Sequence, residues 1–330
     1  MLLSLPAGTR PSPVDSGRRG VTLLSGFLGS GKTTLLRRQL DQAGSRPPAV
    51  ILNDFAQTVV DDVLLGSQGE APLVVSGGCA CCTRRDGLAH ALTGLLDAEQ
   101  RGTVARRDHV VIETSGLSDP GPIAFTMAND PVLKHHYALA RVCVTVDALT
   151  GLSSIEHHQV ALRQLLAADD VFVTKADLVT PTHLEPLVSR LRAINPSATI
   201  SVTAGGVLVR TETPSGAGRH RAITVPPTEA THTSAISTLE LVIEEPLDWQ
   251  AFAVWLSLLL HRHGSNVLRV KGALNVQGVG PVAVNGVQHI VHRPEHLTEP
   301  SPPGTRLVFI VRDIAPLLLE RSFRTFVAIK

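Results

Sequence analysis

Short apolar runs alternate with longer helical stretches through the first two thirds of the chain. The runs lie between Val21 and Val202 and read VTLLSG, AVILND, PLVVSG, HVVIET, RVCVTVDA, DVFVTKAD and ATISVTA. They are continuously rich in Val, Ile and Leu, which is typical of parallel strands covered on both faces. Helical stretches lie between them, at residues 33–43, 87–100, 159–168 and 183–194. This alternation predicts a doubly wound α/β domain with a mostly parallel sheet.

The pattern changes after about residue 204. Residues 203–233 are rich in Thr, Gly and Pro, which predicts a linker or a long loop. Beyond them, STLELVIEEP predicts a strand, LDWQAFAVWLSLLLHRHG a helix, and VLRVKGALNV, GPVAVNGVQHIV and TRLVFIVRD further strands. We therefore expect a disordered leader at 1–19, the α/β domain at 20–204, a linker at 205–232 and a smaller α+β domain at 233–330.

Composition narrows the classes of protein that this chain can belong to. Hydrophobic residues make up 43% of the 330 residues and charged residues 18%, too few charges for a disordered chain. Lys and Arg number 30 against 29 for Asp and Glu, so no global field attracts nucleic acid or an anionic membrane. The leader does not resemble a signal peptide, and no run reaches about 18 apolar residues. We expect a soluble cytoplasmic protein with no nucleic-acid or membrane partner.

A phosphate-binding loop is predicted directly after the first strand. GFLGSGKTT, residues 26–34, fits the pattern G-x-x-x-x-G-K-[ST] and lies between a strand and a helix, a setting that disfavours a chance Gly-rich turn. The glycines let backbone N–H groups face a phosphate, and the helix N-terminus adds a favourable dipole. Lys32 is expected to reach the β- and γ-phosphates and Thr33 to hold Mg²⁺. The expected nucleotide-binding residues of this loop are Gly26, Gly29, Ser30, Gly31, Lys32, Thr33 and Thr34.

The tetrapeptide TKAD, at the end of a later strand, predicts which base the bound nucleotide carries. The carboxylate of Asp177 can accept hydrogen bonds from the ring N–H and the exocyclic amine of guanine, a donor pair that adenine lacks. Thr174 and Lys175 complete the expected contacts, because the aliphatic stem of Lys175 can pack on the base. An N-cap role for Asp177 at the next helix is the alternative.

VVIETSGLSDP, residues 110–120, supplies a carboxylate and a glycine near the phosphates. The strand ends in Glu113, which can bind Mg²⁺ directly or through water. The backbone amide of Gly116, three residues later, can contact the γ-phosphate. A solvated acid at the end of a strand is the alternative for Glu113. Together with Lys32, this stretch favours Mg²⁺-dependent hydrolysis of a nucleoside triphosphate.

Three of the four cysteines lie in the short sequence GGCACC, at Cys79, Cys81 and Cys82. The preceding glycines at 77 and 78 allow the turn that would let three thiolates converge, and such soft ligands favour Zn²⁺ over Mg²⁺. A fourth ligand would be water, Asp54 or a group of a client protein. Two other roles stay open, namely buried small side chains and a redox-active pair.

The remaining cysteine and the histidines carry less weight. Cys143 lies inside an apolar run and is expected to be a packing residue. HIVHRPEH brings three histidines close in sequence, but Pro294 interrupts their spacing, so surface polar residues are expected more than metal ligands. The histidines weighed in this way are His289, His292, His296, His261 and His263.

In this order, these stretches resemble the CobW-type family of P-loop GTPases, relatives of the urease and hydrogenase nickel accessory GTPases. The similarity covers nearly the whole chain, from LLSGFLGSGKTTLL through GGCACC, VVIETSGLSDP and QLLAADDVFVTKADL to VLRVKGALNV and RLVFIVRD. The family's Cys-x-Cys-Cys signature maps onto Cys79, Cys81 and Cys82 and implies a site for a divalent transition metal. The resemblance implies slow GTP hydrolysis coupled to delivery of the metal, with zinc preferred, to a client metalloprotein that the second domain recognises. The resemblance is also compatible with a homodimer of this protein.

The chain departs from the family pattern after its second strand. Where relatives carry an acidic run like NEFG-E, this sequence has NDFAQ, so that Asp54 keeps an acid while Ala56 and Gln57 replace a Gly and a Glu. The usual acid before the cysteine loop is also missing. We treat Asp54, with Lys32 and Glu113, as a candidate catalytic residue that orients water or coordinates Mg²⁺. Two rival functions stay open, an adaptor or activator of a metalloenzyme with negligible turnover and an ATP-dependent kinase or ligase.

Overall fold

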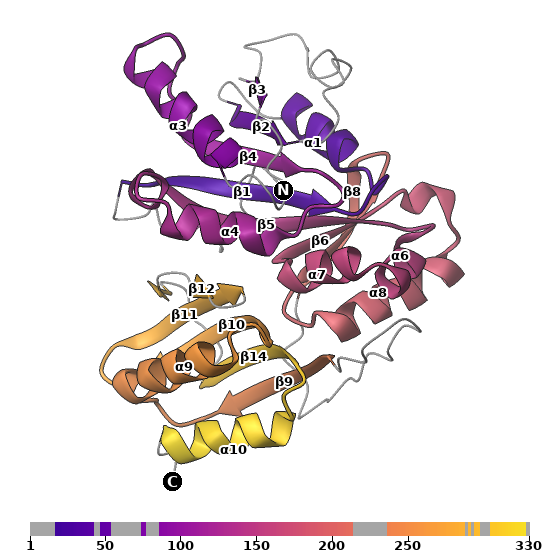
Figure 1. Cartoon of the computed structure of the whole chain (residues 1–330). Helices are drawn as coiled ribbons and strands as arrows, with labels where there is room; N and C mark the ends of the chain where they lie inside the picture. The colour runs from indigo at the N-terminus through magenta and orange to yellow at the C-terminus, as the bar shows by residue number, and fades with distance from the viewer. Residues whose placement is uncertain are drawn as a thin grey trace. The chain divides into compact units, whose positions relative to one another are not determined.

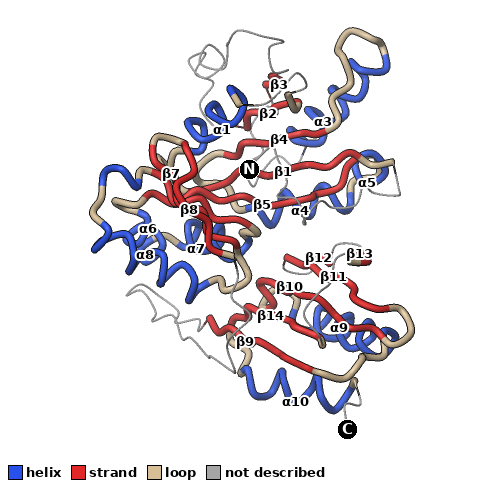
Figure 2. Tube along the Cα trace, turned by 180° about the vertical axis from the view of Figure 1, so that it is seen from behind, coloured by secondary structure: helices blue, strands red, loops and turns tan. Residues whose placement is uncertain are grey.

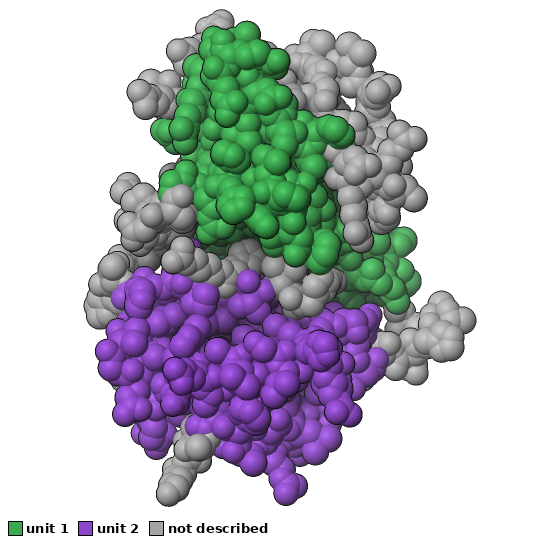
Figure 3. All heavy atoms as spheres, turned by 60° about the vertical axis from the view of Figure 1, so that its left-hand side comes forward, with its two compact units in different colours: residues 1–189, 198–213 green, residues 190–197, 214–330 purple. Residues whose placement is uncertain are grey.

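The structure is a computed structural model, and it describes residues 17–42, 47–53, 74–76, 86–213, 236–287, 290–291, 294–297 and 304–327. The chain forms two compact units, residues 1–189 with 198–213 and residues 190–197 with 214–330 (Figure 3). Each unit has its own sheet, and the two are described separately below.

The first unit is built on an eight-stranded sheet with the order β3-β2-β4-β1-β5-β6-β7-β8 (Figures 1 and 2). Neighbouring strands are parallel except β7 and β8. Every residue of β6 is buried, and β1 and β4 are buried at all but one position each, which explains their unbroken apolar runs. The predicted doubly wound, mostly parallel α/β fold is confirmed. The strands are β1 Arg19–Gly26, β2 Ala49–Asn53, β3 Val74–Ser76, β4 His109–Thr114, β5 Tyr137–Asp147, β6 Asp170–Thr174, β7 Thr199–Ala204 and β8 Val207–Glu212.

The helices of this unit include those that the sequence predicts and several that it does not. The four predicted helical stretches correspond to α1 Lys32–Asp41, α3 Asp86–Gln100, α7 Gln159–Ala167 and α8 Pro181–Ile194. The additional elements are α4 Pro120–Asn129, α5 Leu133–His136, α6 Gly151–His157 and the 3₁₀ turn η1 Ala176–Leu178. Helix α4 begins where the carboxylate of Asp119 accepts a hydrogen bond from the Gly121 amide and Pro120 occupies the first turn.

Cys143 on β5 belongs to the apolar core between the sheet and α1. Its side chain packs in one cluster with residues such as Leu36, Val111 and Phe172 and is 1% exposed. Burial, reinforced by the nearby carboxylate of Asp170, raises the pKa of the Cys143 thiol well above its usual value. A thiol that stays protonated is a poor nucleophile and metal ligand, and the predicted packing role is confirmed.

Strand β8 extends the first sheet into the stretch that the sequence assigns to a linker. Gly205 and Gly206 join β7 to β8, with φ angles of 54° and 80° that suit a tight hairpin turn. The described beginning of that stretch is therefore part of the sheet. The two consecutive glycines ahead of the β-branched run VLVRTE are the local signal for this hairpin.

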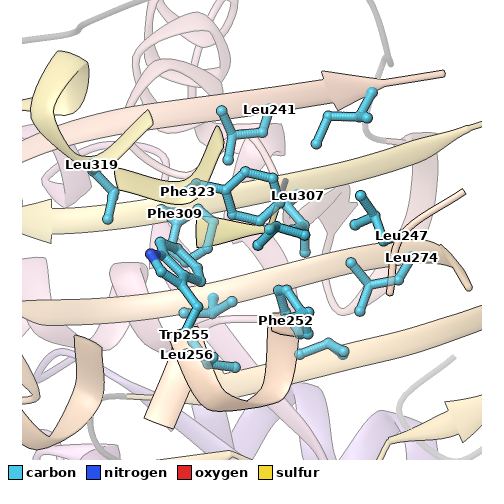
Figure 4. Packing of buried hydrophobic residues seen from close by; sticks show 14 of the residues in the cluster. Leu241, Leu247, Phe252, Trp255, Leu256, Leu274, Leu307, Phe309, Leu319 and Phe323 are labelled. Carbon is cyan, nitrogen blue, oxygen red and sulfur yellow. The ribbon is translucent and has the colours of Figure 1, made fainter. Parts of the chain in front are cut away.

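The second unit has a six-stranded sheet with the order β12-β11-β10-β14-β9, and β13 pairs with β11. Its described strand pairs are antiparallel, and the predicted smaller α+β domain is confirmed. Figure 4 shows the core, in which Phe252 and Trp255 of α9 meet Phe309 of β14 and Phe323 of α10. The elements are β9 Ile236–Ile243, α9 Trp249–His263, β10 Val267–Val276, β11 Gly280–Val287, β12 Ile290–Val291, β13 Glu295–His296, β14 Thr305–Arg312 and α10 Pro316–Phe326. Within the described residues, no helix combines the length and the apolar character needed to cross a bilayer.

Candidate nucleotide site

The predicted phosphate-binding residues lie where β1 ends and α1 begins. Gly26 and Gly31 adopt φ angles of 143° and 88°, in a region that residues with a side chain rarely occupy. A Cβ atom on Gly26 would lie 2.2 Å from the Thr145 hydroxyl and 2.7 Å from that of Ser30. Glycine is therefore required at position 26 both for its backbone conformation and for the approach of β5.

Side-chain hydroxyls from two other strands hold this loop in place. Ser30 Oγ and Thr145 Oγ1, on β5, are 2.6 Å apart in a buried hydrogen bond. Thr174 Oγ1, at the end of β6, donates to the Ser30 carbonyl at 2.7 Å. The sequence analysis named Ser30 as a phosphate-binding residue and Thr174 as a base contact, and it missed Thr145. Only the pairing of β1 with β5, which places Gly26 opposite Thr145, brings that residue to the loop.

The ammonium group of Lys32 lies inside the loop. It donates to the Gly26 carbonyl at 2.9 Å and to the Phe27 carbonyl at 3.2 Å, and the residue is only 9% exposed. These contacts place a positive charge beside the backbone that faces a phosphate. The geometry therefore allows Lys32 to bind a phosphate oxygen, as the sequence predicts.

Thr33 and Glu113 are brought together from α1 and β4. Thr33 Oγ1 donates to Glu113 Oε1 at 2.5 Å, and Glu113 is 8% exposed at the end of its strand. This burial argues against the alternative of a solvated acid. A hydroxyl and a carboxylate side by side are the hard oxygen donors that Mg²⁺ prefers, so the residues present fit this ion.

The segment after β4 is fixed against both the phosphate-binding loop and helix α7. A Cβ atom on Gly116 would lie 2.7 Å from the backbone nitrogen of Leu28, so the two backbones are in contact. Gln164 Nε2, on α7, donates to the carbonyls of Gly116 at 3.1 Å and Ser118 at 2.9 Å. The sequence analysis did not identify Gln164, because a glutamine in a helix gives no signal that it is buried.

The residues predicted to bind the base surround the end of β6. Lys175 has a φ of 57°, and its ammonium forms an ion pair with the largely buried Asp147 of β5. Asp177 lies in η1 with an exposed side chain, and its Oδ1 accepts a hydrogen bond from the Gly205 amide at 3.1 Å. Since α8 starts only at Pro181, Asp177 does not occupy its N-cap position. The carboxylate is therefore accessible to a base.

Several predicted site residues lie outside the described residues. These are Asp54, Ala56, Gln57, Cys79, Cys81, Cys82, His289 and His292. Of the other histidines, His261 and His263 lie in the last turn of α9 and His296 on β13. In the described part of the chain, no group of three or more His, Cys, Asp or Glu side chains is arranged to hold a metal ion.

Family models match both units of the chain. Residues 20–202 match the model of the CobW/HypB/UreG nucleotide-binding domain, and residues 236–327 match that of the cobalamin synthesis protein cobW C-terminal domain. The two matches follow one another in the order of the two sheets.

Individual proteins show the same likeness. The zinc chaperone YjiA of Escherichia coli is 34% identical over 270 residues, which cover 78% of this chain and 82% of YjiA. The zinc-regulated GTPase metalloprotein activator 1 of Schizosaccharomyces pombe is 33% identical over 196 residues, 57% of this chain and 46% of that protein. The crystal structure of the zinc(II)-bound YjiA GTPase from E. coli has a TM-score of 0.65 at 26% identity, covering 94% of this chain and 99% of that chain.

Proposed function

The chain belongs to the CobW/HypB/UreG family of nucleotide-binding proteins, and from this premise we propose that it binds and hydrolyses GTP and delivers zinc to a client metalloprotein. The observation that carries the nucleotide part is the meeting of Lys32, the Thr33–Glu113 pair and the Asp177 turn at one edge of the first sheet. Zinc is favoured because the relatives YjiA and the yeast activator are named for it.

Hydrolysis follows from the charges around the phosphate-binding loop. The Lys32 ammonium stabilises the negative charge that develops on the transferred phosphoryl group. Thr33 and Glu113 would hold Mg²⁺, which when bound neutralises charge on the β- and γ-phosphates. The Gly116 amide donates to the γ-phosphate, and Asp54 orients the attacking water. A slow basal rate is part of this proposal.

The choice of guanine follows from the Asp177 carboxylate. Its two oxygens can accept from the ring N–H and the exocyclic amine of guanine, a donor pair that adenine lacks. The ion pair between Lys175 and Asp147 fixes the aliphatic stem of Lys175 against which the base can pack. The contact of Asp177 with Gly205 orients the carboxylate.

Zinc is the cargo in this proposal, bound by the thiolates of Cys79, Cys81 and Cys82. Three thiolates leave one position of a tetrahedral zinc ion open, where a ligand of the client can attack. We place the protein in the cytoplasm, where thiols stay reduced and can ligate metal. The nucleotide state changes the cysteine geometry and so the zinc affinity.

The test is an equilibrium zinc titration of the wild type and the Cys81→Ala variant, each with and without Mg²⁺ and a GTP analogue. The wild-type zinc affinity should change at least fivefold with the analogue, the lower end of typical coupling between two sites. Cys81→Ala should bind zinc about 100-fold more weakly, because one of few ligands is lost.

Cys143→Ala is the matched control for this titration. It removes a thiol from the buried core, where the raised pKa disfavours metal binding, and should leave zinc affinity unchanged. Equal zinc affinity in wild type and Cys81→Ala, with and without the analogue, would contradict the proposed coupling.

We propose that the second unit recognises the client, through a groove between α9 and α10. The groove encloses about 390 Å³, and on its walls Leu258 and Leu318 are 54% and 66% exposed. Arg262 and His263 line it together with a single acid, Asp313. Apolar side chains at helical spacing on both walls suit the apolar face of an amphipathic helix.

A photo-crosslinking amino acid placed at position 318 of the full chain tests this assignment, with position 317 as the control. Leu317 is 78% exposed on the same helix but does not line the groove. Position 318 should capture, far more than position 317, a zinc protein whose captured peptide is an amphipathic helix. Capture of a second copy of this chain, or equal capture from both positions, would contradict the assignment.

A further inference from the structure

Gln164 is a fully buried side chain whose two hydrogen bonds go to the backbone of another element. It lies on α7 and is 0% exposed, and both of its hydrogen bonds go from Nε2 to carbonyls of the segment after β4. Fixing a long polar side chain in the interior costs side-chain freedom and desolvation, which the two hydrogen bonds must offset. The two hydrogen bonds hold the backbone of residues 116–118 in one conformation.

The other end of the same amide is not satisfied within the described residues. Gln164 Oε1 is buried and makes no hydrogen bond there. The two hydrogen bonds that the amide does make both go to the segment after β4, so its contacts with that segment are what the proposal rests on. A small cavity of about 20 Å³ is lined by Gln164 together with Leu28 and Ser30 of the phosphate-binding loop, so the side chain lies beside that loop.

The segment that Gln164 holds contains the residue whose backbone has the greatest freedom. Gly116 has no Cβ atom, so its peptide planes can rotate more easily than those of other residues. Holding the Gly116 carbonyl at 3.1 Å fixes the peptide plane between Gly116 and Leu117 and so restricts rotation about the Gly116 Cα–C bond. With the Ser118 carbonyl held as well, the path of the segment that carries the Gly116 N–H is restricted. Contact with the Leu28 backbone further limits where the segment can lie.

We propose that Gln164 is a positioning residue that sets the Gly116 amide for the γ-phosphate, so that α7 senses whether GTP or GDP is bound. This inference rests on the proposed GTP binding. In this proposal α7, which is distant in sequence from the phosphate-binding loop, contributes to the discrimination between GTP and GDP. Because GDP has no γ-phosphate, the loss of Gln164 affects the two nucleotides differently.

The test compares Gln164→Leu with Gln159→Leu, an exposed glutamine at the start of the same helix. The dissociation constants for GDP and for a non-hydrolysable GTP analogue are measured by calorimetry, and GTP turnover is measured on the same samples. Gln164→Leu should weaken binding of the analogue about tenfold and change GDP binding by less than twofold. Gln159→Leu should change neither.

A second variant guards against misfolding of the first. Gln164→Asn keeps the amide but shortens the side chain by one methylene, so it should show the same selective loss with less disturbance of packing. Equal weakening for both nucleotides, or none in a folded variant, overturns the proposal. Failure of the wild type to bind GTP overturns the proposed function instead, so the two outcomes are distinguishable.

Discussion

Replacement of Lys32 with alanine is expected to lower GTP affinity about 100-fold and the turnover of bound GTP by a factor of about 10²–10³. The variant loses a charge that lies within 2.9 Å of the Gly26 carbonyl and faces the phosphate-binding backbone. Hydrogen bonds to charged groups contribute about 1.5–3 kcal/mol each, and a phosphate contact that strengthens during transfer adds to the loss in rate. Calorimetry with a GTP analogue and a phosphate-release assay measure the two effects.

Arg37→Ala is the matched control for this variant. Arg37 lies on the same helix with an exposed side chain, so its removal changes the net charge equally without touching the loop. It should keep both affinity and turnover within about twofold of the wild type. Retention of GTP turnover in Lys32→Ala would show that the hydrolase assignment is wrong.

The variant Asp177→Asn should exchange the preferred base, with GTP affinity about 100-fold lower and xanthosine triphosphate affinity higher than in the wild type. An amide offers one acceptor and one donor, whereas guanine presents two donors to this position. Xanthine has a carbonyl where guanine has its exocyclic amine, so it matches the amide. The loss corresponds to one or two hydrogen bonds to a charged group, each about 1.5–3 kcal/mol.

A competition assay with GTP, ATP and xanthosine triphosphate measures this exchange. Asp248→Asn is the control, because Asp248 caps α9 in the second unit and asparagine caps equally well. A wild type that binds ATP as tightly as GTP would favour the rival kinase or ligase. Negligible turnover together with tight GTP binding would favour the adaptor.

The strands could be predicted more fully than the helices. β4 coincides with an apolar run of the sequence, because a strand covered on both faces of a sheet needs such a run. β10 coincides with the predicted strand VLRVKGALNV. Helix α10 was not predicted, although Pro316 at its start and the buried Leu319 and Phe323, four residues apart, give the local pattern. The glycine pair before β8 was likewise assigned to a linker or a long loop.

At the site, sequence identified the residues of contiguous motifs and missed those that only the fold assembles. Lys32 and Thr33 are specified by their place in one loop, and the structure brings Glu113 to Thr33 as expected. Thr145 and Gln164 reach the same region from other elements, and nothing in their own neighbourhoods distinguishes them from ordinary strand and helix residues. Tertiary packing, which single-sequence patterns do not encode, decides their role.

The buried hydroxyl contacts of Ser30 with Thr145 and Thr174 have a consequence for the speed of nucleotide capture. They fix the shape of the phosphate-binding loop when the sheet forms. The conformational entropy of the loop is therefore lost during folding and is not lost again each time a nucleotide binds. A loop that already has its binding conformation can bind the nucleotide at the rate of correctly oriented collisions, because no loop closure has to precede binding.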